Sequence, residues 1–256
     1  MSRKNKNSIN SETIAESARD LGRLLNKLLQ KCGLEIKSYP DFDAKRRMKI
    51  INNYKINTIF DIGANRGQYS KNLREMGYNK KIISFEPLED AFEKLEKVSS
   101  RDENWIVNNY ALGDENTKSI INVSNNSYSS SILDMLPKHF DSAPESKYIK
   151  QQEINVKKLD SIFKSFCNTK NKVMIKIDTQ GYEKKVLDGA KNSLKDIKVV
   201  QLEMSLVPLY QEEMLFLEMT HYLQEKGFQL FSLENGFADP LTGQLLQVDG
   251  IFVSLK

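Results

Sequence analysis

The sequence is poor in the residues that build metal sites, disulfide frameworks and membrane spans. Its 256 residues include two cysteines, Cys32 and Cys167, and two histidines, His139 and His221, and none of them shows ligand-type spacing. This scarcity argues against a disulfide framework and against a zinc knuckle, and it favours a reducing compartment. No apolar run approaches the roughly 20 residues that cross a bilayer, and no apolar signal core follows the basic N-terminus. We therefore expect a cytoplasmic protein without a membrane span.

The sequence also lacks a strong excess of charge of either sign. Its 38 Lys and Arg residues against 34 Asp and Glu residues give a formal net charge of +4, which is mild for a chain of this length. No basic stripe interleaved with aromatic residues stands out, so the composition predicts no nucleic-acid partner. A hydrophobic fraction of 39% is enough to build a core, and the length fits one α/β domain with an extension.

Residues 1–54 have the pattern of an N-terminal helical extension. From Ser11 onward, apolar residues recur at three- and four-residue spacing, and Gly33 ends the predicted helix. A second short helix is expected at about residues 43–52. The segment either packs on the main domain, or forms a homodimer contact or a cover for the active site, and the sequence leaves these alternatives open.

Residues 55–256 alternate between short apolar β segments and helical patterns, which predicts one domain with a parallel, right-handed, doubly wound sheet. The predicted strands are 58–62, 81–85, 105–108, 173–177, 197–202, 228–233 and 250–255, and the predicted helices are 68–76, 88–98, 183–194 and 214–226. The expected fold class is α/β: a Rossmann-like, doubly wound, mostly parallel seven-stranded sheet with a C-terminal antiparallel hairpin.

The regular alternation pauses between about residues 118 and 155. A strand is expected at 119–123, and the rest is rich in Asn and Ser and contains two prolines. Loops of this length in a compact domain are usually functional or disordered. We expect this one to rim the active site.

The loop at residues 61–67 follows the first strand and opens the first helix of the main domain. Gly63 and Gly67 allow sharp turns and a close approach of the backbone to a ligand. A dinucleotide-binding loop needs Gly-x-Gly-x-x-Gly, and Asn65 and Gln68 occupy the second and third glycine positions. The acidic Asp61 suits a cationic sulfonium cofactor with a free amino group better than a pyrophosphate. Asp61, Gly63, Asn65 and Gly67 are therefore predicted to bind S-adenosyl-L-methionine.

Two further strand ends supply candidate cofactor contacts. Glu86 ends the second strand, where an acidic side chain accepts both ribose hydroxyls of a nucleoside; the plain alternative is an exposed glutamate near a turn. The third strand leads into Ala111 and Leu112, which are predicted to flank the adenine, and either Asp114 or a backbone amide is a candidate for its edge. A simple turn is the alternative for this segment.

The fourth and fifth parallel strands end in carboxylates that face the same crevice. Asp178 is the candidate that removes or hydrogen-bonds the proton of an acceptor hydroxyl, and Glu203 is a second candidate. Glu183 either orients the acceptor or is a charge at a helix N-terminus. Lys176 is interpreted as a structural strand residue, and residues 127–131 either contact the acceptor or form a polar loop. Asp178 and Glu203 are too few for a complete metal site, so a divalent cation is an alternative that we do not favour.

Four segments together resemble the FkbM family of methyltransferases over about residues 55–255. They are Phe60–Gly67, Phe85–Pro87, Ala111–Gly113 and Lys176–Glu183. The resemblance implies a class I methyltransferase fold, S-adenosylmethionine as cofactor, and O-methylation of hydroxyls on sugars, polyketides or other small metabolites.

The sequence thus predicts an S-adenosylmethionine-dependent O-methyltransferase that acts on a sugar, a glycan or a small metabolite. A methyltransferase for nucleic acid or protein is one alternative. Residues 178–181 lack the Asn/Asp-Pro-Pro-Tyr/Phe motif that many nucleic-acid amino-methyltransferases carry there. A non-catalytic nucleotide-binding module is the other alternative, although such a module would be expected to lose Asp61, Gly63 or Glu86.

Overall fold

The computed structural model describes residues 20–36 and 39–256. The chain divides into two compact units, Met1–Arg46 and Arg47–Lys256. The boundary after residue 54 between a helical extension and the main domain stays a prediction. Within the described ranges, no helix combines the length and the apolar character that crossing a membrane requires.

The first unit contains a helix over residues 20–29, followed by the 3-10 turn η1 (Gln30–Cys32). Gly33 ends this segment as predicted, because it adopts a φ of 72° that glycine tolerates without strain. The first part of the predicted helix, residues 11–19, lies outside the described residues. The helix α2 (Phe42–Asn53) confirms the second predicted helix; it begins in the first unit and ends in the second.

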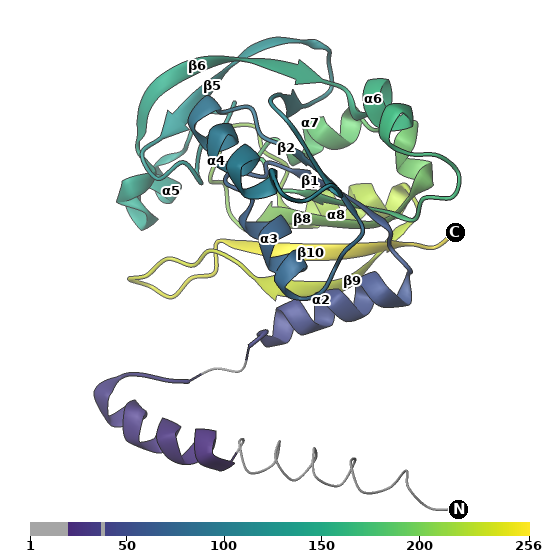
Figure 1. The fold of residues 1–256 in the computed structure, drawn as a ribbon. Helices are drawn as coiled ribbons and strands as arrows, with labels where there is room; N and C mark the ends of the chain where they lie inside the picture. Colours follow the sequence, from purple (N-terminus) through teal and green to yellow (C-terminus); the bar gives the residue numbers. More distant parts are fainter. Residues whose placement is uncertain (1–19, 37–38) are drawn as a thin grey trace, which may run out of the picture. The chain divides into compact units, whose positions relative to one another are not determined.

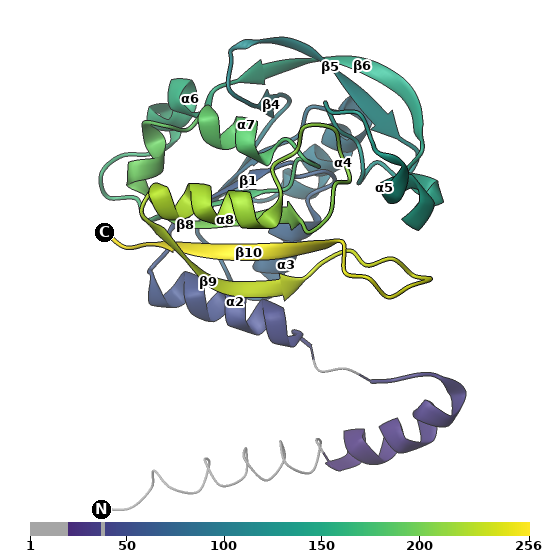
Figure 2. The same cartoon turned by 180° about the vertical axis from the view of Figure 1, so that it is seen from behind.

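The second unit is built on a seven-stranded sheet with the order β3-β2-β1-β7-β8-β10-β9 (Figures 1 and 2). Its strands are β1 (Thr58–Ile62), β2 (Lys81–Phe85), β3 (Trp105–Asn108), β7 (Val173–Ile177), β8 (Ile197–Ser205), β9 (Phe228–Asn235) and β10 (Gln247–Ser254). The first five run parallel, and β10 pairs antiparallel with both β8 and β9. The predicted fold class, with its C-terminal antiparallel hairpin, is confirmed.

Helices cover both faces of this sheet, so the central strands are buried on both sides. One hydrophobic cluster joins a sheet face to α6 (Leu159–Phe166), α7 (Glu183–Asp188) and α8 (Phe216–Glu225). A second joins the opposite face to α3 (Gln68–Glu75), α4 (Glu89–Ser99) and the last residues of α2. The predicted helix 183–194 is shorter than expected, since α7 ends at Asp188 and the 3-10 turn η3 (Ser193–Asp196) follows.

The segment expected to be a long loop between residues 118 and 155 is mostly ordered, which corrects that prediction. It forms a second sheet of order β4-β6-β5 from β4 (Ala111–Leu112), β5 (Thr117–Ser124) and β6 (Tyr148–Lys157). Strands β5 and β6 pair antiparallel as a long curved ribbon (Figure 1). Between them lie α5 (Pro137–Ser142) and the turn η2 (Pro144–Ser146). Much of β6 is exposed, so it carries the polar residues 150–153 and lacks the apolar pattern by which a strand is predicted from sequence.

Candidate active site

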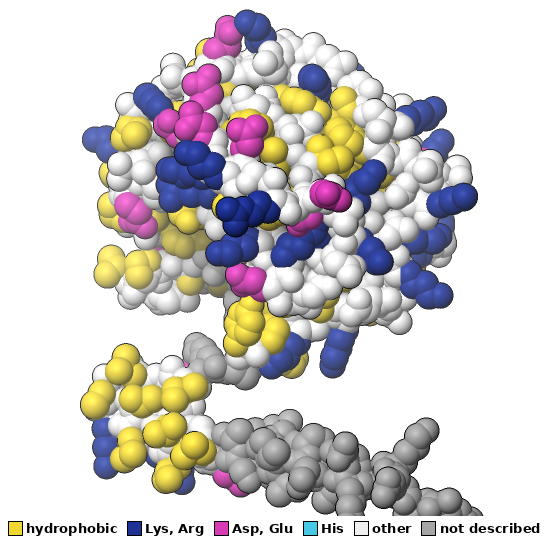
Figure 3. All heavy atoms as spheres, in the orientation of Figure 1, with side chains coloured by type: hydrophobic (Ala, Val, Ile, Leu, Met, Phe, Trp, Pro, Cys, Tyr) yellow, Lys and Arg dark blue, Asp and Glu magenta, His cyan; other side chains and the backbone are white. Residues whose placement is uncertain are grey.

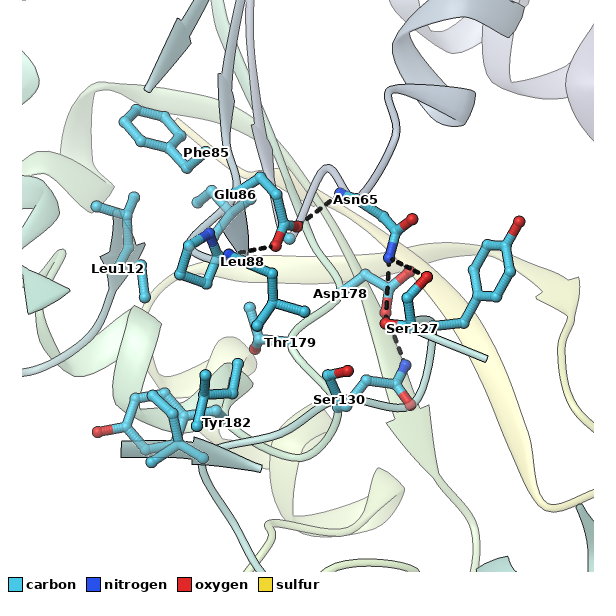
Figure 4. Close-up of a pocket in the computed structure, with 18 of the residues that line it drawn as sticks. Asn65, Phe85, Glu86, Leu88, Leu112, Ser127, Ser130, Asp178, Thr179 and Tyr182 are labelled. Carbon is cyan, nitrogen blue, oxygen red and sulfur yellow. Dashed lines mark hydrogen bonds between the residues drawn. The ribbon is translucent and has the colours of Figure 1, made fainter. Parts of the chain in front are cut away.

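A pocket of about 260 Å³ lies at the carboxyl ends of β2, β1, β7 and β8 (Figure 4). In a doubly wound sheet this edge is where ligands bind. The residues that line the pocket are Ile62, Gly63, Asn65, Phe85, Glu86, Pro87, Leu88, Ala111, Leu112, Ile121, Ser127, Tyr128, Ser130, Ile132, Asp178, Thr179, Gln180, Tyr182 and Glu203. Seven of the ten residues predicted for the site are among them; Asp61, Gly67 and Glu183 are not.

The loop after β1 is held against β2 and β7 by its backbone. The amides of Gly63 and Ala64 both donate to the carbonyl of Phe85 at 3.0 Å. Gly63 has a φ of 79°, and a Cβ added there would lie 1.8 Å from the carbonyl oxygen of Asp178. Glycine at position 63 therefore allows the loop after β1 to pack against the backbone of Asp178 after β7. It also leaves the backbone of this loop open to a ligand in the pocket. A Cβ on Gly67 would instead meet the core side chains Leu95 and Trp105.

Asp61 lies beneath the pocket and not in its wall. Its side chain is fully buried, and Oδ2 accepts a hydrogen bond from Ser70 Oγ at 2.7 Å. Its Oδ1 lies 3.8 Å from Lys176 Nζ. Burial raises the pKa of this carboxyl despite the ammonium beside it. Asp61 thus lies beside Lys176 of β7 and does not line the pocket.

Glu86 faces the pocket and is held in place by two backbone donors. Asn65 N donates to Oε2 and Leu88 N donates to Oε1, each at 2.8 Å (Figure 4). Each carboxylate oxygen has two lone pairs, so both keep one for a ligand. The side chain is 4% exposed, and burial raises its pKa to about 7 against the lowering effect of the two amides. The carboxylate is therefore oriented to accept from a pair of hydroxyls.

The wall beside Glu86 is apolar. It comprises Phe85, Leu88, Ala111, Leu112, Ile121 and Ile132, which come from β2, β4, β5 and the segments that follow β2 and β5. Such a wall suits a flat, apolar ring. Asp114, the candidate for the ring edge, does not line the pocket and forms an ion pair with Lys185 at 2.8 Å.

Asp178 ends β7 with both carboxylate oxygens hydrogen-bonded. Lys176 Nζ donates to Oδ2 at 3.0 Å, and Gln180 Nε2 donates to Oδ1 at 2.8 Å. Burial lowers the pKa of Lys176, but the carboxylates of Asp178 and Asp61 outweigh burial and raise it overall. Lys176 therefore stays charged and connects the strand below the cofactor loop to the acceptor side.

Glu203 lies two residues before the end of β8 and shares a donor with Asp178. Its Oε2 accepts from Gln180 Nε2 at 2.7 Å and from Gln247 Nε2 at 2.9 Å. Tyr210 OH donates to Gln180 Oε1 at 2.7 Å, which fixes the orientation of that amide. Burial, followed by the charge of Asp178, raises the pKa of the Glu203 carboxyl well above its ordinary range. Asp178 and Glu203 thus form one hydrogen-bonded pair through Gln180.

Glu183 occupies the first turn of α7 behind the pocket. Its Oε1 accepts from Thr179 N at 2.8 Å and from Thr179 Oγ1 at 3.1 Å. The side chain is 5% exposed, and burial raises its pKa to about 7. These contacts stabilise the turn that carries Asp178.

Sequence analysis missed the amides and the tyrosine that position the two carboxylates. Gln180 follows Asp178 closely enough to have been a candidate, and its φ of 56° signals a constrained turn. Tyr210 lies in the connection after β8, and Gln247 begins β10, so no spacing in the sequence relates them to the site. Of the segment 127–131, Ser127, Tyr128 and Ser130 line the pocket, and Asn65 Nδ2 donates to Ser127 O at 3.1 Å.

The pocket wall contains the acidic residues Glu86, Asp178 and Glu203 and no Lys, Arg or His side chain among the described residues. Within residues 20–36 and 39–256, no three His, Cys, Asp or Glu side chains are grouped so that they could hold a metal ion. On the face shown in Figure 3, Lys and Arg side chains form separate groups, with acidic side chains near several of them. A ligand that offers two hydroxyls, a flat ring and a positive charge would match the pocket.

Comparison with protein families gives one match that covers most of the second unit. The model described as "Methyltransferase FkbM domain" matches residues 61–230. A search of curated proteins gives no match.

Similar solved structures include M. capricolum TrmK in complex with S-adenosyl-homocysteine, at 10% identity and a TM-score of 0.46, covering 86% of this chain and 70% of that one. An rRNA methylase from Streptococcus thermophilus has 9% identity and a TM-score of 0.43, with 82% and 97% covered. TehB from Haemophilus influenzae has 11% identity and a TM-score of 0.44, with 83% and 61% covered.

Proposed function

The chain belongs to the FkbM methyltransferase family, and from this premise we propose that it transfers a methyl group from S-adenosylmethionine to a hydroxyl of a sugar, a glycan or another small metabolite. The observation that carries the proposal is the arrangement of one pocket along four adjacent strand ends. Glu86, the 63–65 loop, Asp178 and Glu203 follow one another around it in the order β2, β1, β7, β8. This order gives the pocket two ends. We call the end formed by Glu86 and the 63–65 loop the nucleoside end, and the end formed by Asp178 and Glu203 the acidic end.

The residues at the nucleoside end fit S-adenosylmethionine. The Glu86 carboxylate, fixed by the amides of Asn65 and Leu88, has a free lone pair on each oxygen for the two ribose hydroxyls. Leu88 and Leu112 belong to an apolar wall of the kind that packs on adenine. When bound, the cofactor supplies an electrophilic methyl group on a positively charged sulfur, and a pocket rich in carboxylates favours that charge.

The residues at the acidic end fit a hydroxyl acceptor. Methyl transfer requires the acceptor oxygen to be aligned with the methyl group, and positioning of this kind supplies much of an enzyme's acceleration. Asp178 and Glu203 hold their carboxylates in the pocket wall, joined by Gln180. A carboxylate in reach of the hydroxyl accepts its proton as the new O–C bond forms. Glu183 supports this end from behind by holding Thr179.

Ligand binding tests the proposal before an acceptor is known. We expect isothermal titration calorimetry of the full chain to detect S-adenosylmethionine and S-adenosylhomocysteine at micromolar levels, and to detect no binding of NAD⁺. The variant Glu86→Gln should bind both sulfur nucleosides more weakly, whereas Glu183→Gln, the same substitution outside the pocket wall, should bind them as the wild type does. Failure of the wild type to bind either sulfur nucleoside would refute the proposal.

A transfer assay then tests the acceptor class. The full chain is incubated with S-[methyl-³H]adenosylmethionine and a panel of monosaccharides and methyl glycosides. We expect label in at least one hydroxylated product, and Asp178→Ala should reduce that transfer far more than it reduces cofactor binding. Equal losses of transfer and binding would remove Asp178 from the acceptor side.

A further inference from the structure

The two carboxylates at the acidic end of the pocket differ in what offsets their charge. Both oxygens of Asp178 have donors, and one of these donors is the Lys176 ammonium at 3.0 Å. The donors to Glu203 are the neutral amides of Gln180 and Gln247, and both donate to Oε2. Within the described part of the chain, no hydrogen-bond partner is found for Glu203 Oε1. This oxygen is therefore available to a ligand in the pocket.

The groups that surround Glu203 disfavour its ionised form. Asp178 acts on it from β7, Asp249 from β10 and Glu183 from α7, and Lys176 opposes them from β7. Asp249 is its direct partner across the antiparallel β8–β10 pair. From the connection after β8, the buried Tyr210 also interacts with it electrostatically. In the free protein, burial and these acidic neighbours thus favour the neutral form of Glu203.

The methyl donor and its demethylated product differ by one methyl group and one positive charge. A cation in the pocket favours an ionised carboxylate there, and a neutral thioether does not. Asp178 is already matched by Lys176, so the carboxylate with an unmatched charge is the one that responds. Glu203 meets this condition and also lines the pocket.

We infer that binding of the cationic methyl donor drives a proton off Glu203, and that the ionised Glu203 then takes the proton of the acceptor hydroxyl. The inference rests on the proposed function. The hydroxyl O–H bond breaks and its proton goes to Glu203, while the O–CH₃ bond forms and the S–CH₃ bond electrons stay on sulfur. Cation and carboxylate become neutral thioether and carboxylic acid, so Glu203 ends protonated, as it began.

Gln180 and Gln247 are positioning residues in this scheme. Their amides donate to Oε2 of Glu203 and leave Oε1 without a donor among the described residues. Tyr210 orients Gln180 by donating to its carbonyl oxygen at 2.7 Å. Both amides stabilise the ionised form of Glu203, so removing either one should raise the pH at which Glu203 loses its proton.

The test compares proton release on binding of S-adenosylmethionine and S-adenosylhomocysteine. Calorimetric titrations of the full chain in phosphate and in Tris, which differ in ionisation enthalpy, give the number of protons released. Near pH 7 we expect the methyl donor to release up to about one proton more than the product. Ionisation of Glu86 contributes equally to both ligands and cancels in the difference. Glu203→Gln should abolish the difference and still bind S-adenosylhomocysteine, whereas Glu153→Gln, the same substitution at an exposed position of β6, should keep it.

The outcomes separate this inference from the proposed function. If neither ligand binds, the proposed function fails. If both bind and release equal numbers of protons between pH 6 and 9, the function stands and the role of Glu203 is wrong. A difference that persists in Glu203→Gln, or that is lost in the control Glu153→Gln, would also overturn it. If Glu203→Gln does not fold, Gln247→Leu provides the test. In this variant the difference in proton release between the two ligands should persist, and the pH at which it is largest should be higher than in the wild type. An unchanged pH of the maximum would contradict the inference.

Discussion

Cofactor binding should depend on pH through Glu86, and S-adenosylhomocysteine is the ligand that isolates this effect. The Glu86 carboxyl has a pKa of about 7 in the free protein because it is buried. Its two oxygens already accept from Asn65 N and Leu88 N, so only the ionised form offers a lone pair on each oxygen to the ribose hydroxyls. A protonated Glu86 would present a donor where the ligand needs an acceptor.

The size of the effect follows from this pKa. At pH 8 about nine-tenths of the free protein carries ionised Glu86, and at pH 6 about one-tenth does. The dissociation constant of S-adenosylhomocysteine should therefore rise about tenfold from pH 8 to pH 6, which corresponds to about 1.4 kcal/mol. Binding should also release close to one proton at pH 6, because the ligand selects the ionised form.

Calorimetric titration at pH 6, 7 and 8 measures both quantities. Glu86→Gln cannot ionise, so its weaker binding should not change over this range. Glu183 also has a pKa raised to about 7, but it lies outside the pocket wall, and Glu183→Gln should keep the tenfold change. A wild-type dissociation constant that stays flat between pH 6 and 8, or a pH dependence that survives in Glu86→Gln, would refute the reasoning.

Three further predictions concern stability. Burial raises the pKa of Glu183 from 4.5 to about 7, so the protonated side chain stabilises the fold below pH 4.5 and this contribution is lost as the pH rises through 7. In urea unfolding, Glu183→Gln should therefore be more stable than the wild type at pH 8, by up to about 3 kcal/mol, and should have no such advantage at pH 4.5. Gly63→Ala should lose about 2–5 kcal/mol and bind no S-adenosylhomocysteine, because its Cβ would lie 1.8 Å from Asp178 O at a φ of 79°; a wild-type melting temperature would contradict this. Lys176→Met should cost about 3–5 kcal/mol, since it removes the cation beside the fully buried Asp61, and adding Asp61→Asn should recover most of the loss in the same unfolding assay.

The parallel strands were predictable because burial on both faces leaves a continuous apolar signature. β1 and β7 are short runs in which every residue is buried, and their predicted bounds match the structure. β6 carries no such signature, since four consecutive polar residues, 150–153, occupy a strand that is largely exposed. Exposure thus hid β6. The helix α6 was missed as well, and its length does not explain this, because α3 also has 8 residues and was predicted.

The candidate site was predictable wherever a residue ends a parallel strand. Glu86 and Asp178 directly follow β2 and β7, and Glu203 lies near the end of β8, so the carboxyl edge of the sheet brings them around one pocket. Gln247 reaches the same place from the start of β10, an antiparallel strand whose position between β8 and β9 is a property of the topology. Which antiparallel strand lies beside β8 is not encoded in any local pattern.

Strand register explains why Asp61, which was predicted to bind the cofactor, does not line the pocket. Asp61 is directly beside Ser84 on β2 and Lys176 on β7, and Lys176 is beside Gln201 on β8. All four side chains are buried, so they form a polar layer one step below the pocket. A charged side chain in this layer needs a partner of opposite charge, because a lone buried charge is costly. The single ammonium of Lys176 lies 3.8 Å from Asp61 in this layer and 3.0 Å from Asp178 above it. The first motif of the domain is therefore coupled to the acceptor-side carboxylate through a lysine that sequence analysis treated as structural.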